Sequence, residues 1–131
     1  MSEALTKEFK NQLININKMY VNKDFKSAYT GYMNLLIDNP DSPYILHNLG
    51  VACYHLKQYK EGAAHFIEAL KFDGFNNNYM AFLNAANCCV CAGDMVNAKA
   101  FIEKAYSIKP DDSKVNTLYK KIASCFVTKI D

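Results

Sequence analysis

The pattern of apolar, small and polar residues between positions 43 and 76 repeats between positions 79 and 112. In the first stretch the residues that carry the pattern are Asn48, Leu49, Gly50, Tyr54, Tyr59, Gly62, Phe66, Ala69, Leu70 and Asp73. In the second they are Phe82, Ala85, Ala86, Cys89, Gly93, Asp94, Ala98, Ile102, Ala105 and Pro110. The small residues let two antiparallel helices approach where their axes cross, while the bulky ones fill the space between them. Each stretch therefore predicts an antiparallel pair of helices.

A less regular copy precedes them over residues 9–42. It keeps Met19, Tyr20, Lys23, Asp24, Phe25, Ala28, Tyr32 and Pro40 in register. Gln12 and Asn15 stand where bulky residues are expected. The first helix of this copy therefore has either the regular orientation or a rotated one. In the rotated form the apolar stripe is Leu5, Phe9, Leu13 and Ile16.

A final helix is predicted over residues 113–130. Asp111, Asp112 and Ser113 supply helix-capping side chains after Pro110. Apolar residues then follow at helical spacing with lysines between them, namely Val115, Leu118, Ile122, Cys125 or Phe126, and Ile130. Because a repeat unit cannot bury its own apolar face, we expect this helix to cover the end of a stacked array.

The residues at these offsets resemble the tetratricopeptide repeat family, whose unit has roughly 34 residues. The resemblance implies an all-α fold over residues 1–131, a right-handed array of antiparallel helix pairs. Three repeats over about 9–42, 43–76 and 79–112 precede a capping helix over about 113–130. The second and third repeats start 36 positions apart. The two extra residues fit best in the polar run Asn76, Asn77 and Asn78, where an insertion costs little.

Composition narrows the class of partner. Lys and Arg total 15 against 13 Asp and Glu, a net charge of +2, which offers no electrostatic footprint for nucleic acid or an anionic membrane. No run approaches the roughly 20 apolar residues of a membrane-spanning helix, and the start of the chain lacks the apolar block of a signal peptide. We therefore expect a cytoplasmic protein that binds no nucleic acid and does not insert into membranes.

Catalytic and metal-binding signatures are missing from the sequence. It contains no Gly-rich phosphate loop, no GxSxG and no HExxH, and its three histidines have no acidic residue at a relay spacing. Cys88, Cys89 and Cys91 invite a metal site, but consecutive helical residues diverge by about 100° and no companion motif is present. We therefore predict a protein that is not an enzyme and uses no cofactor or metal ion.

In the family that the chain resembles, the first helix of each pair faces a concave groove. The resemblance implies that the partner-binding residues are Leu13, Asn17, Tyr20, Tyr44, His47, Val51, Tyr54, Met80, Leu83 and Asn87. This surface is apolar and aromatic, with scattered hydrogen-bonding groups. Relatives that bind the C-terminal carboxylates of heat-shock chaperones use a clamp of Lys, Asn and Arg. The matching places here are Leu13, Asn17, Asn48, Met80 and Asn84, without cations.

An apolar groove on a small three-repeat domain is similar to the class II chaperones of bacterial type III secretion, which hold hydrophobic translocators before export. The resemblance implies a cytoplasmic chaperone whose client, a protein or peptide, lays an apolar segment in the groove. A scaffold or adaptor in a multiprotein complex is the alternative. In one form of it a second copy of the chain fills the groove and makes a homo-oligomer.

Overall fold

The structure is a computed structural model that describes residues 3–74 and 76–126, with side chains described from residue 7 onward. This part of the chain forms seven α-helices and no strand. The helices are α1 (Glu3–Val21), α2 (Phe25–Asp38), α3 (Pro43–His55), α4 (Tyr59–Ala69), α5 (Tyr79–Ala92), α6 (Met95–Ile108) and α7 (Ser113–Cys125). The all-α prediction is confirmed.

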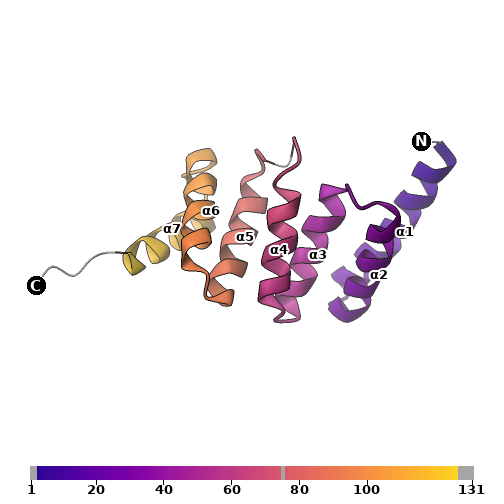
Figure 1. Ribbon diagram of the computed structural model, residues 1–131, viewed down its shortest axis with the longest axis horizontal. Helices are drawn as coiled ribbons and strands as arrows, with labels where there is room; N and C mark the ends of the chain where they lie inside the picture. The colour runs from indigo at the N-terminus through magenta and orange to yellow at the C-terminus, as the bar shows by residue number, and fades with distance from the viewer. Residues whose placement is uncertain (1–2, 75, 127–131) are drawn as a thin grey trace, which may run out of the picture.

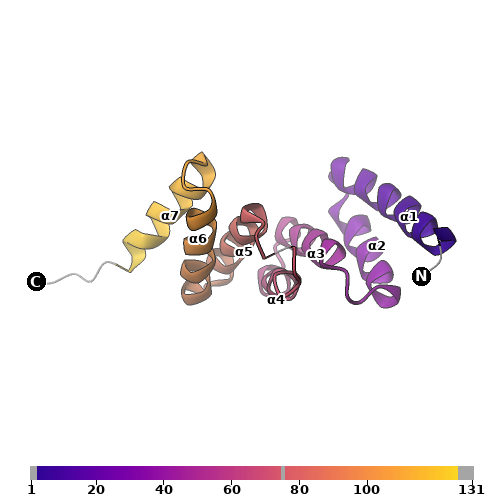
Figure 2. The ribbon, with the colours of Figure 1, turned by 90° about the horizontal axis from the view of Figure 1, so that it is seen from above.

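The helices stack side by side along the long axis of the molecule, with α1 and α7 at opposite ends of the row (Figures 1 and 2). Each helix packs against the next one in the sequence, from α1 on α2 to α6 on α7. Helices α1 and α2, α3 and α4, and α5 and α6 form three antiparallel pairs. Helix α7 follows as a single helix at the end of the row.

A tight turn of the same kind joins the two helices of every pair. Lys23, Lys57 and Gly93 adopt positive φ values of 63°, 64° and 81°, at positions 34 and then 36 residues apart. At each turn the next backbone N–H returns to a carbonyl five residues earlier, as in Asp94 N to Cys89 O at 2.8 Å. This is the Schellman arrangement that ends a helix. The turns therefore reproduce the unequal repeat spacing seen in the sequence.

Two clusters of buried residues make up the core. The first lies between α1, α2 and α3 and contains Ile16, Ala28, Tyr32, Leu35, Ile45, Leu49, Ala52 and Cys53. The second joins α4, α5, α6 and α7 and includes Phe66, Phe82, Ile102, Val115, Leu118 and Ile122. The interior is thus a row of interfaces between neighbouring helices, the packing expected of a repeat array.

Both ends of the array differ in detail from the regular pattern. Helix α1 begins at Glu3, ahead of the start at residue 9 assigned to the first repeat, and it buries Ile16 with Phe9 and Leu13 packed beside it. Gln12 is exposed. The rotated apolar stripe is therefore the one used, except that the Leu5 side chain lies outside the described residues. Helix α7 ends at Cys125, and the predicted Ile130 is also outside them.

Candidate protein-binding groove

A pocket of about 490 Å³ opens along the first helices of the three pairs. Helix α3 supplies its centre and α1 and α5 supply its sides, because every second helix in the row faces the same way. Its lining residues are Asn17, Tyr20, Val21, Tyr32, Tyr44, His47, Asn48, Val51, Tyr54, His55, Phe66, Met80, Asn84 and Asn87. We call this surface the groove.

The groove carries no acidic side chain and no Lys or Arg among its lining residues. Burial lowers the pKa of both His47 and His55 below the ordinary value of 6.5, so both imidazoles are neutral at pH 7. Tyr44 and Met80, with 48% and 38% of their surface exposed, place large apolar groups at the entrance. The groove is therefore an uncharged surface of aromatic rings, apolar groups and amides.

Hydrogen bonds between helices fix several of its polar groups. The Tyr32 hydroxyl donates to Asn17 Oδ1 at 2.6 Å, which joins α2 to α1. The Asn84 amide nitrogen lies 3.2 Å from His47 Nε2, which joins α5 to α3. Because His47 is neutral, the amide can donate to the imidazole lone pair. These bonds hold the floor of the groove in one arrangement before any ligand binds.

Aromatic contacts order one wall of the groove. His55 stacks on Phe25 at 4.2 Å between ring centroids, and Tyr20 meets both rings edge to face. Tyr54 contacts His55 and Tyr59 edge to face at 5.6 and 5.7 Å. Such geometry adds to the packing of aromatic side chains. The side of the groove formed by α1 and α3 is therefore lined by aromatic rings that pack against one another.

The structure brings eight of the ten residues assigned to the groove by resemblance around this one pocket. They are Asn17, Tyr20, Tyr44, His47, Val51, Tyr54, Met80 and Asn87. Leu13 instead packs beside the first core cluster, and Leu83 is only 3% exposed within the second. Leu83 also borders Leu118 in a shallow pocket beside α7, so the capping helix covers the place where a further groove position would lie.

Six lining residues were not assigned to the groove from sequence: Val21, Tyr32, Asn48, His55, Phe66 and Asn84. Asn48 and Asn84 stand at the offsets of the carboxylate clamp, which was a usable signal. Tyr32 and Phe66 come from the second helices α2 and α4, and they reach the floor between first helices. Groove residues were predicted only from positions on the first helix of each pair, so residues of the second helices could not be found in this way.

The side chains of Cys88, Cys89 and Cys91 on α5 do not point to a common site. Cys88 Sγ donates to the carbonyl oxygen of Tyr59 at 3.1 Å, Cys89 is buried, and Cys91 is exposed. Burial raises the pKa of the Cys88 thiol to about 12 and that of Cys89 to about 11. These two side chains are small packing residues of the second core cluster.

Residues 81–112 match the family model described as tetratricopeptide repeat. The Arabidopsis OM64 TPR domain superposes with a TM-score of 0.82 at 16% identity, over 90% of this chain and 96% of that one. The chain has the tetratricopeptide repeat (TPR) fold. The matched segment covers α6 and nearly all of α5, and the solved structure extends the likeness over almost the whole row of helices.

Two further similar structures are complexes with a bound segment. The first TPR of Spaghetti (RPAP3) bound to the HSP90 peptide SRMEEVD has a TM-score of 0.84 at 15% identity, over 93% of this chain and 95% of that one. PcrH in complex with the chaperone binding region of PopD has a TM-score of 0.72 at 15% identity, over 95% and 90%. No curated protein matches this TPR chain in sequence.

None of the helices within residues 3–74 and 76–126 has both the length and the apolar content needed to cross a membrane.

Proposed function

We propose that this TPR domain is a non-enzymatic binding module that holds an extended apolar segment of another protein in the groove. The observation that carries the proposal is the uncharged lining: Tyr, Val, Phe and Met side chains offer contact area, and four asparagines offer paired donors and acceptors. An extended peptide exposes its backbone N–H and C=O groups, which amide side chains can bind while apolar pockets take the side chains.

The same lining argues against an acidic peptide. The HSP90 peptide bound by the RPAP3 domain ends in Glu-Glu-Val-Asp, so it brings several carboxylates. A buried carboxylate needs a cation or several donors in return. The groove presents four amides and two neutral imidazoles, without Lys or Arg among its lining residues. A neutral apolar segment therefore fits it better.

The chaperone form of the proposal is a cytoplasmic type III secretion chaperone that shields a hydrophobic translocator before export. PcrH, which shares the fold over 95% of this chain, was solved in complex with the chaperone binding region of PopD. A groove that covers an apolar segment removes from water a surface that would otherwise aggregate. This function needs no catalytic residue.

The test compares binding by the Tyr44→Ala/Tyr54→Ala double variant with wild type. The probes are fluorescein-labelled neutral apolar 12-residue peptides and the acidic peptide SRMEEVD. We expect the wild-type protein to prefer a neutral peptide, and the double variant to bind it about tenfold or more weakly, because aromatic anchors dominate such interfaces. Far-UV circular dichroism checks that helicity is kept. The matched control is Ile37→Ala/Val96→Ala, two 75% exposed apolar residues on α2 and α6.

Preference for SRMEEVD, or equal binding of the neutral peptide by wild type and the tyrosine variant, contradicts the groove assignment. The single variant Met80→Ala tests the same surface if the tyrosine pair reduces helicity, because Met80 is exposed at the groove entrance and belongs to neither core cluster.

A scaffold in a multiprotein complex is the second candidate, and the exposed Tyr44, Met80 and Val21 at the groove favour it when a second copy of the chain supplies the occupant. Light scattering across protein concentration distinguishes the two. A groove filled by a neighbouring copy gives a concentration-dependent oligomer that Tyr44→Ala/Tyr54→Ala disperses, whereas a chaperone awaiting its client keeps one mass.

A further inference from the structure

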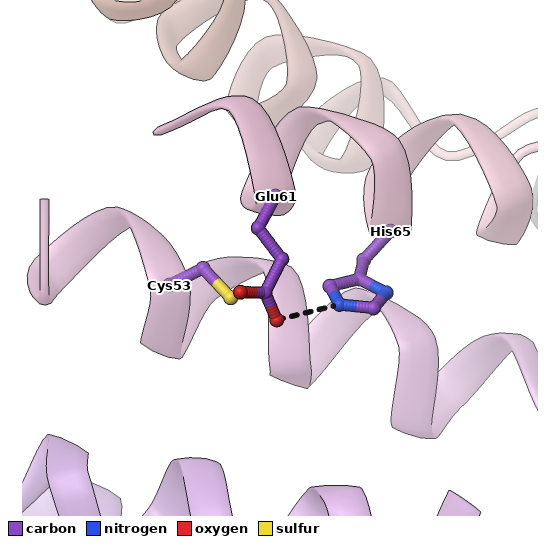
Figure 3. A group of neighbouring side chains, drawn as sticks. All are labelled: Cys53, Glu61 and His65. Carbon is purple, nitrogen blue, oxygen red and sulfur yellow. Dashed lines mark hydrogen bonds and ion pairs between the residues drawn. The ribbon is translucent and has the colours of Figure 1, made fainter. Parts of the chain in front are cut away.

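Three side chains of different chemistry gather between α3 and α4, away from the groove. The Cys53 thiol comes from α3, and the Glu61 carboxylate and His65 imidazole come from α4 (Figure 3). One ligand atom from each, Sγ, a carboxylate oxygen and a ring nitrogen, lies within 4.8 Å of the other two. None of the three lines the groove.

Local structure explains why they meet. Glu61 and His65 are four residues apart on α4, so they project from the same face, and His65 Nε2 lies 3.2 Å from Glu61 Oε2. Between them in sequence, Gly62 lets α4 approach α3 closely: a Cβ atom there would lie 3.1 Å from Cys53 Cβ. The close approach brings the thiol of one helix to the carboxylate of the other.

We propose that Cys53, Glu61 and His65 form a binding site for a zinc ion, with one coordination position left for solvent. Thiolate, imidazole and carboxylate together are the donor set that zinc favours, and three protein ligands with an open fourth position are one of its common arrangements. Magnesium and calcium prefer all-oxygen sites, so this donor set selects against them.

The geometry is close to that of a metal site. Zinc bonds of about 2.0–2.3 Å in a tetrahedron put neighbouring ligand atoms roughly 3.3–3.8 Å apart. The nitrogen and oxygen of His65 and Glu61 are already at 3.2 Å, and the sulfur lies within 4.8 Å of both. The spacing of the three donors is therefore near that of a zinc site, and we expect rotation of the side chains to close the remaining difference.

A second residue orients the carboxylate. The Tyr29 hydroxyl of α2 donates to Glu61 Oε2 at 2.7 Å. Carboxylates that bind metals are held in this way by hydrogen bonds from outside the ligand set. Tyr29 therefore acts as a positioning residue: it fixes the orientation of the Glu61 carboxylate, whose Oε2 also lies 3.2 Å from His65 Nε2 and keeps a further lone pair for the ion.

Burial and charge define how the ion enters. Cys53 is fully buried, whereas 38% of the Glu61 side chain and 18% of the His65 side chain are exposed, so an ion arrives from their side. Burial, followed by the nearby Glu61 carboxylate, raises the pKa of the Cys53 thiol to about 12. A bound divalent cation offsets both causes, because it neutralises the two anions. Binding thus exchanges the thiol proton, which is released to solvent, for a sulfur–zinc bond.

The experiment titrates reduced full-length protein with zinc chloride by calorimetry and with cobalt(II) by absorption spectroscopy. The exposed Cys91 and Cys125 are first changed to serine in every sample, because surface thiols bind metal on their own. We expect one equivalent of zinc to bind. Cobalt is expected to give a thiolate-to-metal charge-transfer band, which Cys53→Ala abolishes.

Ligand variants give the quantitative test. Tyr29→Phe is expected to weaken zinc binding by about tenfold to 100-fold, and Glu61→Gln and His65→Gln by more than about 100-fold. Glu68→Gln is the matched control, because Glu68 is an exposed carboxylate on the same helix that pairs with Lys71. Calcium chloride is expected to give no heat.

Absence of zinc binding at one equivalent, or unchanged affinity in Glu61→Gln and His65→Gln, overturns the proposal. So does a charge-transfer band that survives in Cys53→Ala. Cys53 is buried, but Glu61→Gln and His65→Gln alter partly exposed side chains, so these two variants keep the proposal testable if Cys53→Ala fails to fold.

Discussion

At Gly62 the helices α3, α4 and α5 come into close contact. A Cβ atom on Gly62 would lie 2.8 Å from Cys88 Sγ on α5, and 3.1 Å from both Cys53 Cβ and the backbone oxygen of Gly50 on α3. The backbone oxygen cannot swing away, and Cys88 is held by its hydrogen bond to the Tyr59 carbonyl. The contact between α3, α4 and α5 therefore depends on the absence of a side chain.

Gly62→Ala is expected to lower the free energy of unfolding by up to about 2 kcal/mol. Overpacking costs about 1–3 kcal/mol, and the roughly 1 kcal/mol that alanine gains over glycine in a helix offsets part of this cost. Urea unfolding followed by circular dichroism measures it. Gly31→Ala is expected to be destabilising as well, because its Cβ would lie 2.7 Å from Cγ1 of the buried, β-branched Ile16. Lys60→Ala, at an exposed position on α4, is the control and should leave the free energy of unfolding unchanged. A Gly62→Ala protein as stable as wild type would show that the helices can separate at little cost.

The buried thiols of Cys88 and Cys89 make stability depend on alkaline pH. Burial raises their pKa values from the ordinary 9.0 to about 12 and about 11. Their contribution is therefore complete below about pH 9, where unfolded thiols are also protonated. It is lost as pH rises from about 9 towards 12, because only the unfolded chain ionises there.

We expect the free energy of unfolding to fall between about pH 8 and pH 10, and to fall less in Cys88→Ala/Cys89→Ala. Urea titrations at both pH values measure the change in each protein. Subtracting the change in the variant from the change in wild type cancels the contribution of tyrosine ionisation, which the two proteins share. A thiol reagent at about pH 8 should label the exposed Cys91 in the folded protein and reach Cys88 only after unfolding. Equal pH dependence in the two proteins would rule out a role for these thiols.

At the scale of the element, helix α7 seals the open end of the array. Val115, Leu118 and Ile122 are buried against the preceding pair, and Tyr119 stacks on Tyr106 of α6 at 4.1 Å between ring centroids. Without α7 the apolar face that α5 and α6 turn towards it would meet water. An end helix of this kind is what a repeat array requires.

Ile122→Ala is expected to cost about 2–5 kcal/mol, because Ile122 is only 1% exposed and its removal leaves a cavity. Hydrogen exchange should show the loss of protection in α7 and α6 first. Lys120→Ala, on the exposed face of the same helix, is the control and should leave both the stability and the exchange pattern unchanged. A variant with wild-type protection in α7 would mean that the helix is held by other contacts.

The sequence was sufficient to place most elements, because apolar spacing and small residues both report helix packing. It left the face of α1 open between two orientations, and only the packing of Phe9 and Leu13 around the buried Ile16 decides between them. The groove shows a similar limit. A rule that treats every repeat alike assigned Leu83 to the surface, but Leu83 is buried in the core cluster that also contains Leu118 of α7. Whether a given repeat position is exposed depends on the helices packed against that repeat, and the sequence of a single repeat does not specify them.

Residues from different helices that meet at one point were the hardest to predict. Cys53, Glu61 and His65 form no known motif, since a turn separates the first from the other two. Their convergence depends on how closely α4 approaches α3 at Gly62. The floor of the groove was hard to predict for the same reason, because Tyr32 and Phe66 reach it from the second helices of their pairs.

At the scale of the whole molecule, the core divides into two clusters that meet between α3 and α4. Within residues 3–74 and 76–126, helices contact mainly their neighbours in sequence, and α1 and α7 lie at opposite ends of the row (Figure 1). Stability in such an array is close to a sum of local interfaces. The groove nevertheless takes residues from α1, α3 and α5, so a bound segment would span both clusters.

Ile16→Ala tests whether the two clusters unfold separately. Ile16 is 7% exposed in the first cluster, and its truncation is expected to cost that cluster about 2–5 kcal/mol. Because the interfaces are local, hydrogen exchange followed by mass spectrometry should show faster exchange in α1, α2 and α3, while α5, α6 and α7 keep wild-type protection. Ile14→Ala, at a position 52% exposed on the same helix, is the control and should change neither half. If protection falls equally along the whole chain in Ile16→Ala, the array opens as one cooperative unit, and the interface between α3 and α4 couples the clusters more strongly than a sum of local interfaces allows.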